Sequence, residues 1–199
     1  MADVRVMVVP GSARTGSLNR KLAAQAAQAA RARGAEVTEV DLRALNLPVY
    51  DGDIEAAGMP DGARELRRLF ATHDAMIVVA PEYNAFVTPL LVNSFDWASR
   101  PDPEDGLPSG LASIAGTVVG LLSASPGPVG GMRALIPLRS FLSMSLAMLV
   151  VPQTFSLGKA NEAFGADGRL IDPAQQKAVE RVVAAVLDTA AALKAQAPA

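Results

Sequence analysis

The chain has 199 residues, of which 50% are hydrophobic and 19% charged, with a net charge of −2 and no cysteine. This composition indicates one globular domain over residues 1–199 with a substantial core, and it excludes disulfides, thiolate catalysis and cysteine-bound metal. No basic cluster is available for nucleic acid and no stretch approaches the ~20 apolar residues of a membrane span, so we expect a cytoplasmic protein without either partner.

Apolar runs of strand length alternate with helical segments in the first 80 residues. Continuous apolar runs are typical of strands that are buried on both faces of a sheet. In chain order we predict a strand over Val4–Val9, a helix from a Ser17 cap to about Arg33, a strand over Glu36–Leu42, a loop over 46–60, a helix over Asp61–His73 and a strand over Ala75–Ala80.

The same alternation continues to the C-terminal end of the chain. The later predicted elements are a helix near 89–99, a strand over Thr117–Leu122, a glycine-rich loop over Ser123–Gly131, a helix from Arg133 to about Ala147, a strand within Leu149–Leu157 and a terminal helix that begins at Asp172-Pro173. The buried stripe of this last helix is predicted at Val179, Val182, Val183, Val186, Leu187 and Leu193.

Strands that alternate with helices predict right-handed βαβ units, and therefore an α/β fold with a parallel sheet covered by helices on both faces. In such sheets, ligands bind beyond the carboxyl ends of the strands. Three predicted strands end in loops whose composition suits ligand binding. These loops are residues 11–19, 81–88 and 123–131.

The first loop, residues 11–19, has the composition of an anion-binding site. It lies between a strand and a helix, where backbone N–H groups and the helix dipole favour an anion. Ser12, Ser17 and Asn19 add neutral donors, and Arg14 adds a planar cation suited to phosphate. The alternative interpretation is an ordinary serine-capped helix after a turn.

Residue detail excludes two common phosphate loops here. A nucleoside-triphosphate loop needs Lys and then Ser or Thr after its second glycine, whereas this chain has Ser17 and Leu18. A dinucleotide loop needs a glycine where Ala13 stands. The segment therefore predicts a cradle for a single phosphate group, such as that of a flavin mononucleotide.

The second and third loops suit a planar ligand. Tyr83 offers a flat face and Asn84 a donor and an acceptor on one amide, directly after Pro81. Glycines in Ser123–Gly131 allow the backbone to approach a ligand closely. The alternatives are a partly buried tyrosine, a solvated or subunit-contact carboxylate at Glu82, and a flexible turn.

Four segments together resemble the NADPH-dependent FMN reductase family, which includes flavodoxin-like quinone, chromate and azo-dye reductases. They are GSARTGSLN (11–19), PVYDGDIE (48–55), PEYNAFVTPLLVNSFDWASR (81–100) and SPGPVGGMR (125–133), and the resemblance runs from residue 4 to about residue 190. It implies a flavodoxin-like three-layer sandwich whose five-stranded parallel sheet has the order 2-1-3-4-5. One departure is Val92, where the family usually has lysine.

The resemblance also implies the residues that bind FMN. Those of the phosphate loop are Ser12, Arg14, Ser17, Leu18 and Asn19; those beside the isoalloxazine are Pro81, Glu82, Tyr83 and Asn84; those that close over its other side are Ser125 and Gly127. Asp96 and Trp97 are expected to support helix packing instead. No metal and no catalytic side chain are expected, because the flavin N5 carries the chemistry.

The predicted function is electron transfer from NADPH or NADH through FMN to a small-molecule acceptor: a quinone, chromate, an azo compound or free flavin. One alternative is a flavodoxin-type electron carrier, although the net charge of −2 and the presence of Arg14 argue against it. Another is an interaction module that has lost FMN. The family implies a homodimer or homotetramer, and the helix within Met132–Met148 is first a core helix and second a candidate subunit interface.

Overall fold

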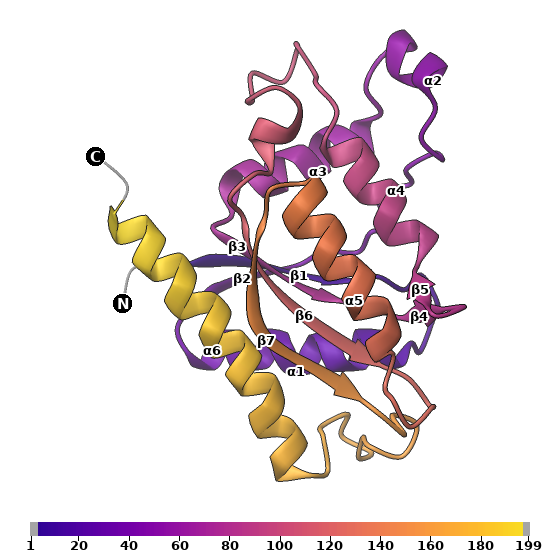
Figure 1. The fold of residues 1–199 in the computed structure, drawn as a ribbon, viewed down its shortest axis with the longest axis vertical. Helices are drawn as coiled ribbons and strands as arrows, with labels where there is room; N and C mark the ends of the chain where they lie inside the picture. The colour runs from indigo at the N-terminus through magenta and orange to yellow at the C-terminus, as the bar shows by residue number, and fades with distance from the viewer. Residues whose placement is uncertain (1–3, 197–199) are drawn as a thin grey trace.

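A five-stranded parallel sheet forms the middle layer of the structure, a computed structural model that describes residues 4–196 (Figure 1). Its order is β2-β1-β3-β6-β7. The strands are β1 (Arg5–Pro10), β2 (Glu36–Glu39), β3 (Ala75–Val79), β6 (Val118–Ala124) and β7 (Leu149–Leu157). Because β6 and β7 are the fourth and fifth strands of this sheet along the chain, the predicted flavodoxin-like order is confirmed.

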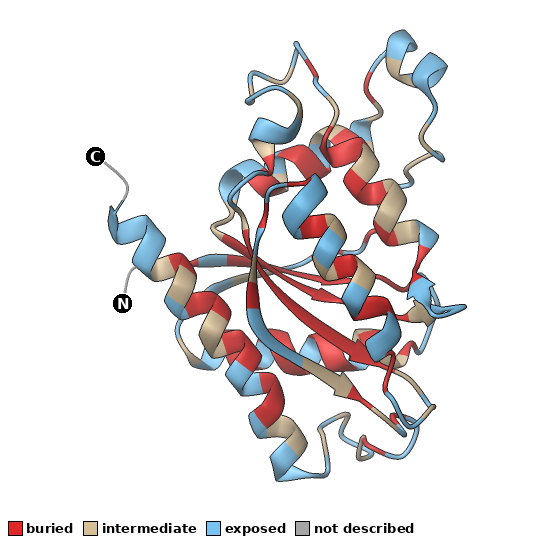
Figure 2. Ribbon diagram, in the orientation of Figure 1, coloured by how far each residue is buried: buried red, intermediate tan, exposed pale blue. Residues whose placement is uncertain are grey.

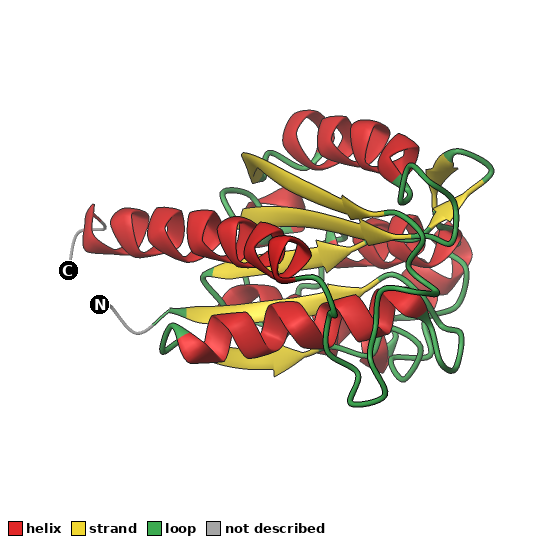
Figure 3. Cartoon of the chain, turned by 90° about the horizontal axis from the view of Figure 1, so that it is seen from below, coloured by secondary structure: helices red, strands yellow, loops and turns green. Residues whose placement is uncertain are grey.

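Two groups of helices cover the two faces of the sheet (Figure 3). One face packs against α1 (Leu18–Ala32) and α6 (Pro173–Gln196). The other face packs against α3 (Asp61–Thr72), α4 (Pro89–Ala98) and α5 (Met132–Ser140). In the described part of the chain, no helix is long and apolar enough to cross a membrane.

The alternation of side chains along each central strand builds two cores. In β1, Val6 and Val8 pack on the α1 and α6 side, whereas Met7 and Val9 pack on the α3, α4 and α5 side. All four are buried, and Figure 2 shows the central strands buried along their length. This two-sided burial explains why the strand reads as one continuous apolar run.

Several segments differ from their predicted form. The strand predicted over Glu36–Leu42 ends at Glu39. The predicted loop over 46–60 contains α2 (Gly52–Ala57), which buries no residue and so has no apolar stripe to detect. The helix predicted to reach Ala147 changes to a π-helical turn at Phe141–Ser145, after Pro137 removes a backbone donor inside α5. The stripe of α6 ends before Leu193, which is 44% exposed in its last turns.

A buried ion pair connects α3 to the long loop between α4 and β6. The side chains of Arg67 and Asp105 are 0% and 2% exposed, and Nε of Arg67 lies 2.5 Å from Oδ2 of Asp105. The guanidinium also donates to Ser113 and to the carbonyls of Arg100 and Pro108. The hydrogen bond from Arg67 holds the pKa of Asp105 below its usual value.

Candidate functional site

A cavity of about 280 Å³ lies where β1, β3 and β6 end at the same edge of the sheet. It is the position at which open α/β sheets bind ligands. Among the predicted site residues, only Asn84 and Gly127 do not line it. The lining consists of Ser12, Arg14, Ser17, Leu18, Asn19, Pro81, Glu82, Tyr83, Ala124, Ser125 and Pro126, of which Ala124 and Pro126 were not predicted.

In the first loop, four successive carbonyl groups are bound by donors of the protein itself. These are the carbonyls of residues 11 to 14, each of which accepts one hydrogen bond from the protein. The donors, in order, are Oγ1 of Thr88 at 3.0 Å, Nε of Arg20 at 3.0 Å, Nη1 of Arg43 at 3.3 Å and the backbone nitrogen of Ser17 at 3.3 Å.

Most backbone N–H groups of the same loop, in contrast, are unpaired within residues 4–196. Five of them have no acceptor among residues 4–196, namely the N–H groups of Ser12, Ala13, Thr15, Gly16 and Leu18. Successive unpaired N–H groups at the start of a helix form a concave site for an anion. Residues mostly outside the loop therefore bind its carbonyls, whereas five of its N–H groups are left for a ligand.

The two serine hydroxyls of this loop accept hydrogen bonds from the backbone. Oγ of Ser17 caps α1 by accepting from the nitrogens of Asn19 and Arg20, at 3.2 and 3.4 Å. Oγ of Ser12 accepts from the nitrogen of Arg14 at 3.4 Å. Because a hydroxyl that accepts in this way keeps its own proton, both serines retain a donor for a ligand. The predicted serine cap at residue 17 is confirmed.

Asn19 joins two loops. Its Nδ2 donates to the carbonyl of Ala124 and its Oδ1 accepts from the nitrogen of Ala124, each at 2.9 Å. This pair of bonds holds the end of β6 against the start of α1. The amide of Asn19 has one further hydrogen on Nδ2, so the side chain both positions the cavity walls and retains a donor.

Arg14 supplies unpaired positive charge to the cavity. Within residues 4–196 its guanidinium makes no hydrogen bond or ion pair, and the side chain is exposed. Arg20, in contrast, pairs with Asp41, and this hydrogen bond lowers the pKa of the Asp41 carboxyl. The free guanidinium of Arg14 is suited to a bidentate contact with phosphate.

The second loop folds into a hairpin that sequence analysis missed. Its strands are β4 (Glu82–Tyr83) and β5 (Phe86–Val87), joined by Asn84 and Ala85. Both turn residues are left-handed, with φ of 52° and 62°, as a two-residue hairpin turn of type I′ requires. The usual signal for such a turn, a glycine at its second position, is absent because alanine stands there. Asn84 consequently lies at the exposed tip.

Glu82 links the second loop to the third. Its carboxylate accepts from the backbone nitrogen of Arg133 at 3.1 Å and from Nε of Arg133 at 2.9 Å. Nη2 of Arg133 contacts the same carboxylate. Since the acid is engaged at the start of α5, Glu82 lines the cavity as an ion-paired group and not as a free base.

The third loop is held by its glycines and by Ser123. The hydroxyl of buried Ser123 donates to the carbonyl of Gly130 at 2.7 Å. A Cβ atom added at Gly130, whose φ is +65°, would lie 2.6 Å from the backbone of Leu157. Gly127 lies behind the lining, with its nitrogen donating to Oγ of Ser125 at 3.2 Å. Ala124, Ser125 and Pro126 are the residues of this loop that line the cavity.

Helix α4 supports a neighbouring segment and lies outside the cavity lining. Trp97 is fully buried and donates from Nε1 to the carbonyl of Pro48 at 2.8 Å. Asn93 binds the same carbonyl and the nitrogen of Tyr50. Burial raises the pKa of Asp96. Trp97 has the packing role expected from the sequence.

The chemistry of this lining is that of binding. One wall carries amide donors, two hydroxyls and the cation of Arg14, which fit a phosphate monoester. The lining also includes Pro81 and Tyr83, which fit a planar heterocycle. The cavity lining contains no histidine or cysteine, and its single carboxylate, Glu82, is ion-paired.

Comparison with known proteins agrees with this geometry. Residues 4–162 match the family model described as NADPH-dependent FMN reductase. The chain is 31% identical to an NAD(P)H-dependent FMN reductase of Pseudomonas aeruginosa, covering 92% of this chain and 94% of that protein. It is 33% identical to a quinone reductase of Pseudomonas putida, covering 84% of each. Among solved structures, the flavoenzyme NAD(P)H:(acceptor) oxidoreductase FerB of Paracoccus denitrificans has a TM-score of 0.78 at 27% identity, over 95% of this chain and 98% of that one.

Proposed function

Because this chain belongs to the NADPH-dependent FMN reductase family, we propose that the cavity at the ends of β1, β3 and β6 holds FMN. The protein is an FMN-dependent oxidoreductase that takes electrons from NAD(P)H and reduces quinones or flavins. The residues proposed to hold the cofactor are Ser12, Arg14, Ser17, Leu18, Asn19, Pro81, Glu82, Tyr83, Asn84, Ser125 and Gly127.

This assignment rests on the difference between the carbonyl and the N–H groups of the first loop. Its carbonyls from residue 11 to residue 14 are bound internally, and five of its N–H groups are not. A loop that engages its acceptors and leaves its donors favours an anion over a cation or a neutral ligand. We assign the FMN phosphate to these amides, with Arg14 as the charged partner and Ser12 and Ser17 as hydroxyl donors.

The reaction balances without a protein acid or base. NAD(P)H gives up a hydride, which carries two electrons and one proton, a second proton comes from water, and a quinone leaves as its hydroquinone. FMN held in this cavity would supply the two-electron redox chemistry between NAD(P)H and the acceptor. The residues of this chain contribute by binding the phosphate and by placing Pro81 and Tyr83 beside the ring. Chromate, azo compounds and free flavin are further acceptors that we propose for the same site.

One experiment separates this function from that of an electron carrier. Purified protein should be yellow or become yellow with added FMN, and anaerobic NADPH or NADH should bleach it. An added quinone should then restore the colour. FMN binding without bleaching by either nucleotide would support the carrier, and no FMN binding would support a module that has lost its cofactor.

We further propose that residues 1–199 form one FMN-binding domain that assembles as a homodimer or homotetramer in the cytoplasm, where NAD(P)H is supplied. Helix α5 supports the assembly, because Leu135 and Leu138 face the core while Met132 and Ile136 are exposed on its other side. Exposed apolar stripes of this kind mark contact surfaces. Sedimentation of the purified protein tests the assembly, and a monomer at all concentrations would exclude it.

A further inference from the structure

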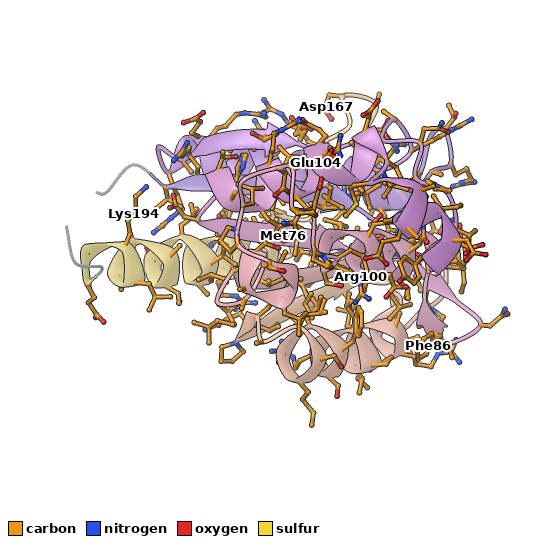
Figure 4. The ribbon with its side chains drawn as sticks, turned by 90° about the horizontal axis from the view of Figure 1, so that it is seen from above. Met76, Phe86, Arg100, Glu104, Asp167 and Lys194 are labelled. Carbon is orange, nitrogen blue, oxygen red and sulfur yellow. The ribbon has the colours of Figure 1, made fainter. Side chains whose placement is uncertain are left out.

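We infer that Phe86, which lies on β5 of the hairpin, binds the apolar part of the electron acceptor and sets the preference of the enzyme for planar, bicyclic quinones. This inference rests on the proposed function. The side chain is 55% exposed, although phenylalanine has no polar group to benefit from water. It lies in the segment 81–100 that resembles the family but is not among the residues predicted to bind FMN, and Figure 4 shows it on the hairpin at the outer edge of the molecule.

The register of the hairpin connects Phe86 to the cavity. Tyr83 and Phe86 are direct partners in the antiparallel pair of β4 and β5. Directly opposed residues project from the same face of such a pair, so the two rings lie on one side of the hairpin. Tyr83 lines the cavity and is itself 52% exposed. Phe86, which does not line the cavity itself, therefore shares an exposed aromatic face with Tyr83, which does.

The opposite face of the hairpin is anchored. There, Glu82 is ion-paired with Arg133 and its partner Val87 is buried. One residue further, the hydroxyl of Thr88 donates to the carbonyl of Gly11 at 3.0 Å. These contacts hold the hairpin against both α5 and the first loop, so the backbone that carries the exposed rings is anchored. A ring that is held in place loses less entropy when it binds a ligand.

The chemistry of this wall favours an uncharged aromatic occupant. The outward pair consists of a phenol and a phenyl ring, which gain most from stacking or edge contacts with another flat ring. Because Tyr83 also lines the cavity, a ligand ring that contacts this aromatic pair would lie beside the proposed flavin site. A fused naphthoquinone offers a second ring that can reach Phe86, whereas a small or highly charged acceptor offers none.

The test uses FMN-loaded protein and isolates the second half of the reaction. Enzyme reduced beforehand with dithionite is mixed anaerobically with 1,4-naphthoquinone or with ferricyanide, and the return of the yellow absorbance is timed. We expect Phe86→Ala to lower the ratio of the naphthoquinone rate constant to the ferricyanide rate constant by roughly threefold to tenfold. Phe86→Tyr should retain the ratio. Ile171→Ala, which removes an exposed apolar side chain outside the cavity lining, should leave it unchanged.

Two results would overturn the inference while leaving the proposed function in place. The first is an unchanged ratio in Phe86→Ala when the parent enzyme is reoxidised by naphthoquinone. The second is an equal slowing with both acceptors together with a smaller sedimentation mass, which would make Phe86 a contact with a second copy of the chain. A parent enzyme that binds FMN but is reoxidised by no quinone would instead remove the proposed function, and this inference with it.

Discussion

Asn19 and Ala124 are 105 residues apart in the chain and exchange two hydrogen bonds, each of 2.9 Å. One amide side chain thereby satisfies both backbone polar groups at the end of β6. The bonds bring the start of α1, with its unpaired amides, against the strand whose following residues, Ser125 and Pro126, line the cavity. Asn19 thus ties the part of the cavity lining formed by the first loop to the part formed by the third loop.

Replacing Asn19 by alanine should destabilise the protein even without FMN. Both buried backbone groups of Ala124 lose their partner, and each unsatisfied group costs roughly 1–3 kcal/mol. We expect the free energy of unfolding of the FMN-free protein to fall by about 2–4 kcal/mol in urea titrations. Asn161→Ala, which removes an exposed asparagine with one long hydrogen bond to Glu162, is the control. An FMN-free protein of unchanged stability would mean that Asn19 acts on the ligand alone.

Replacing Arg14 by alanine should weaken FMN binding without lowering the stability of the FMN-free protein. The guanidinium has no partner among the described residues, so the FMN-free protein should keep its stability within about 0.5 kcal/mol. A charge-assisted hydrogen bond contributes roughly 1.5–3 kcal/mol, which predicts FMN binding weaker by about tenfold to a hundredfold in fluorescence titrations. Arg14→Lys should recover part of the affinity, and the loss should shrink at high salt. Arg169→Ala, outside the cavity lining, is the control; equal affinity in Arg14→Ala would exclude a phosphate contact.

The strands and the serine cap of the first loop were accessible to sequence analysis because their signals are local. Val6 to Val9 read as a buried strand because helices cover both faces of the sheet. The loop of residues 11–19 could be interpreted from its own amides, its serine cap and its position between strand and helix. These features depend on neighbours within about one helical turn, which the sequence itself contains.

The features that sequence analysis missed depend on distant partners or unusual backbone. The partner of Asn19 is 105 residues away, and nothing near residue 19 indicates it. The hairpin turn has Ala85 at φ of 62°, where glycine is the usual signal. The role of Glu82 could not be assigned because its partner, Arg133, begins a different helix. Helix α2 buries no residue and so leaves no periodic pattern.

The third loop offers a test with a closely matched control. Gly130 and Gly106 have similar left-handed backbones, with φ of +65° and +70°. An added Cβ at Gly130 would meet the backbone of Leu157 at 2.6 Å, whereas one at Gly106 meets nothing within 4 Å. Both alanine variants should carry the backbone strain of roughly 1 kcal/mol. We expect only Gly130→Ala to displace the third loop and weaken FMN binding. Equal FMN affinity in the two variants would show that this loop does not shape the site.

The buried pair of Arg67 and Asp105 predicts different pH dependences of stability for the parent protein and for Arg67→Met. In the parent protein, Arg67 lowers the pKa of Asp105, so this contribution to stability is complete above the ordinary aspartate pKa of about 3.9 and is lost as the pH falls below it. Arg67→Met leaves a buried carboxylate without its partner, which should cost about 3–5 kcal/mol at neutral pH. Burial then raises the pKa of Asp105, so protonation on acidification relieves part of that cost and the variant should lose less stability than the parent as the pH falls to about 4.

The double variant Arg67→Met/Asp105→Leu should regain most of the loss at neutral pH, since it buries no charge. Urea unfolding at neutral pH and near pH 4 measures all three proteins; parallel pH dependences in the parent and in Arg67→Met would show that this pair does not titrate with folding.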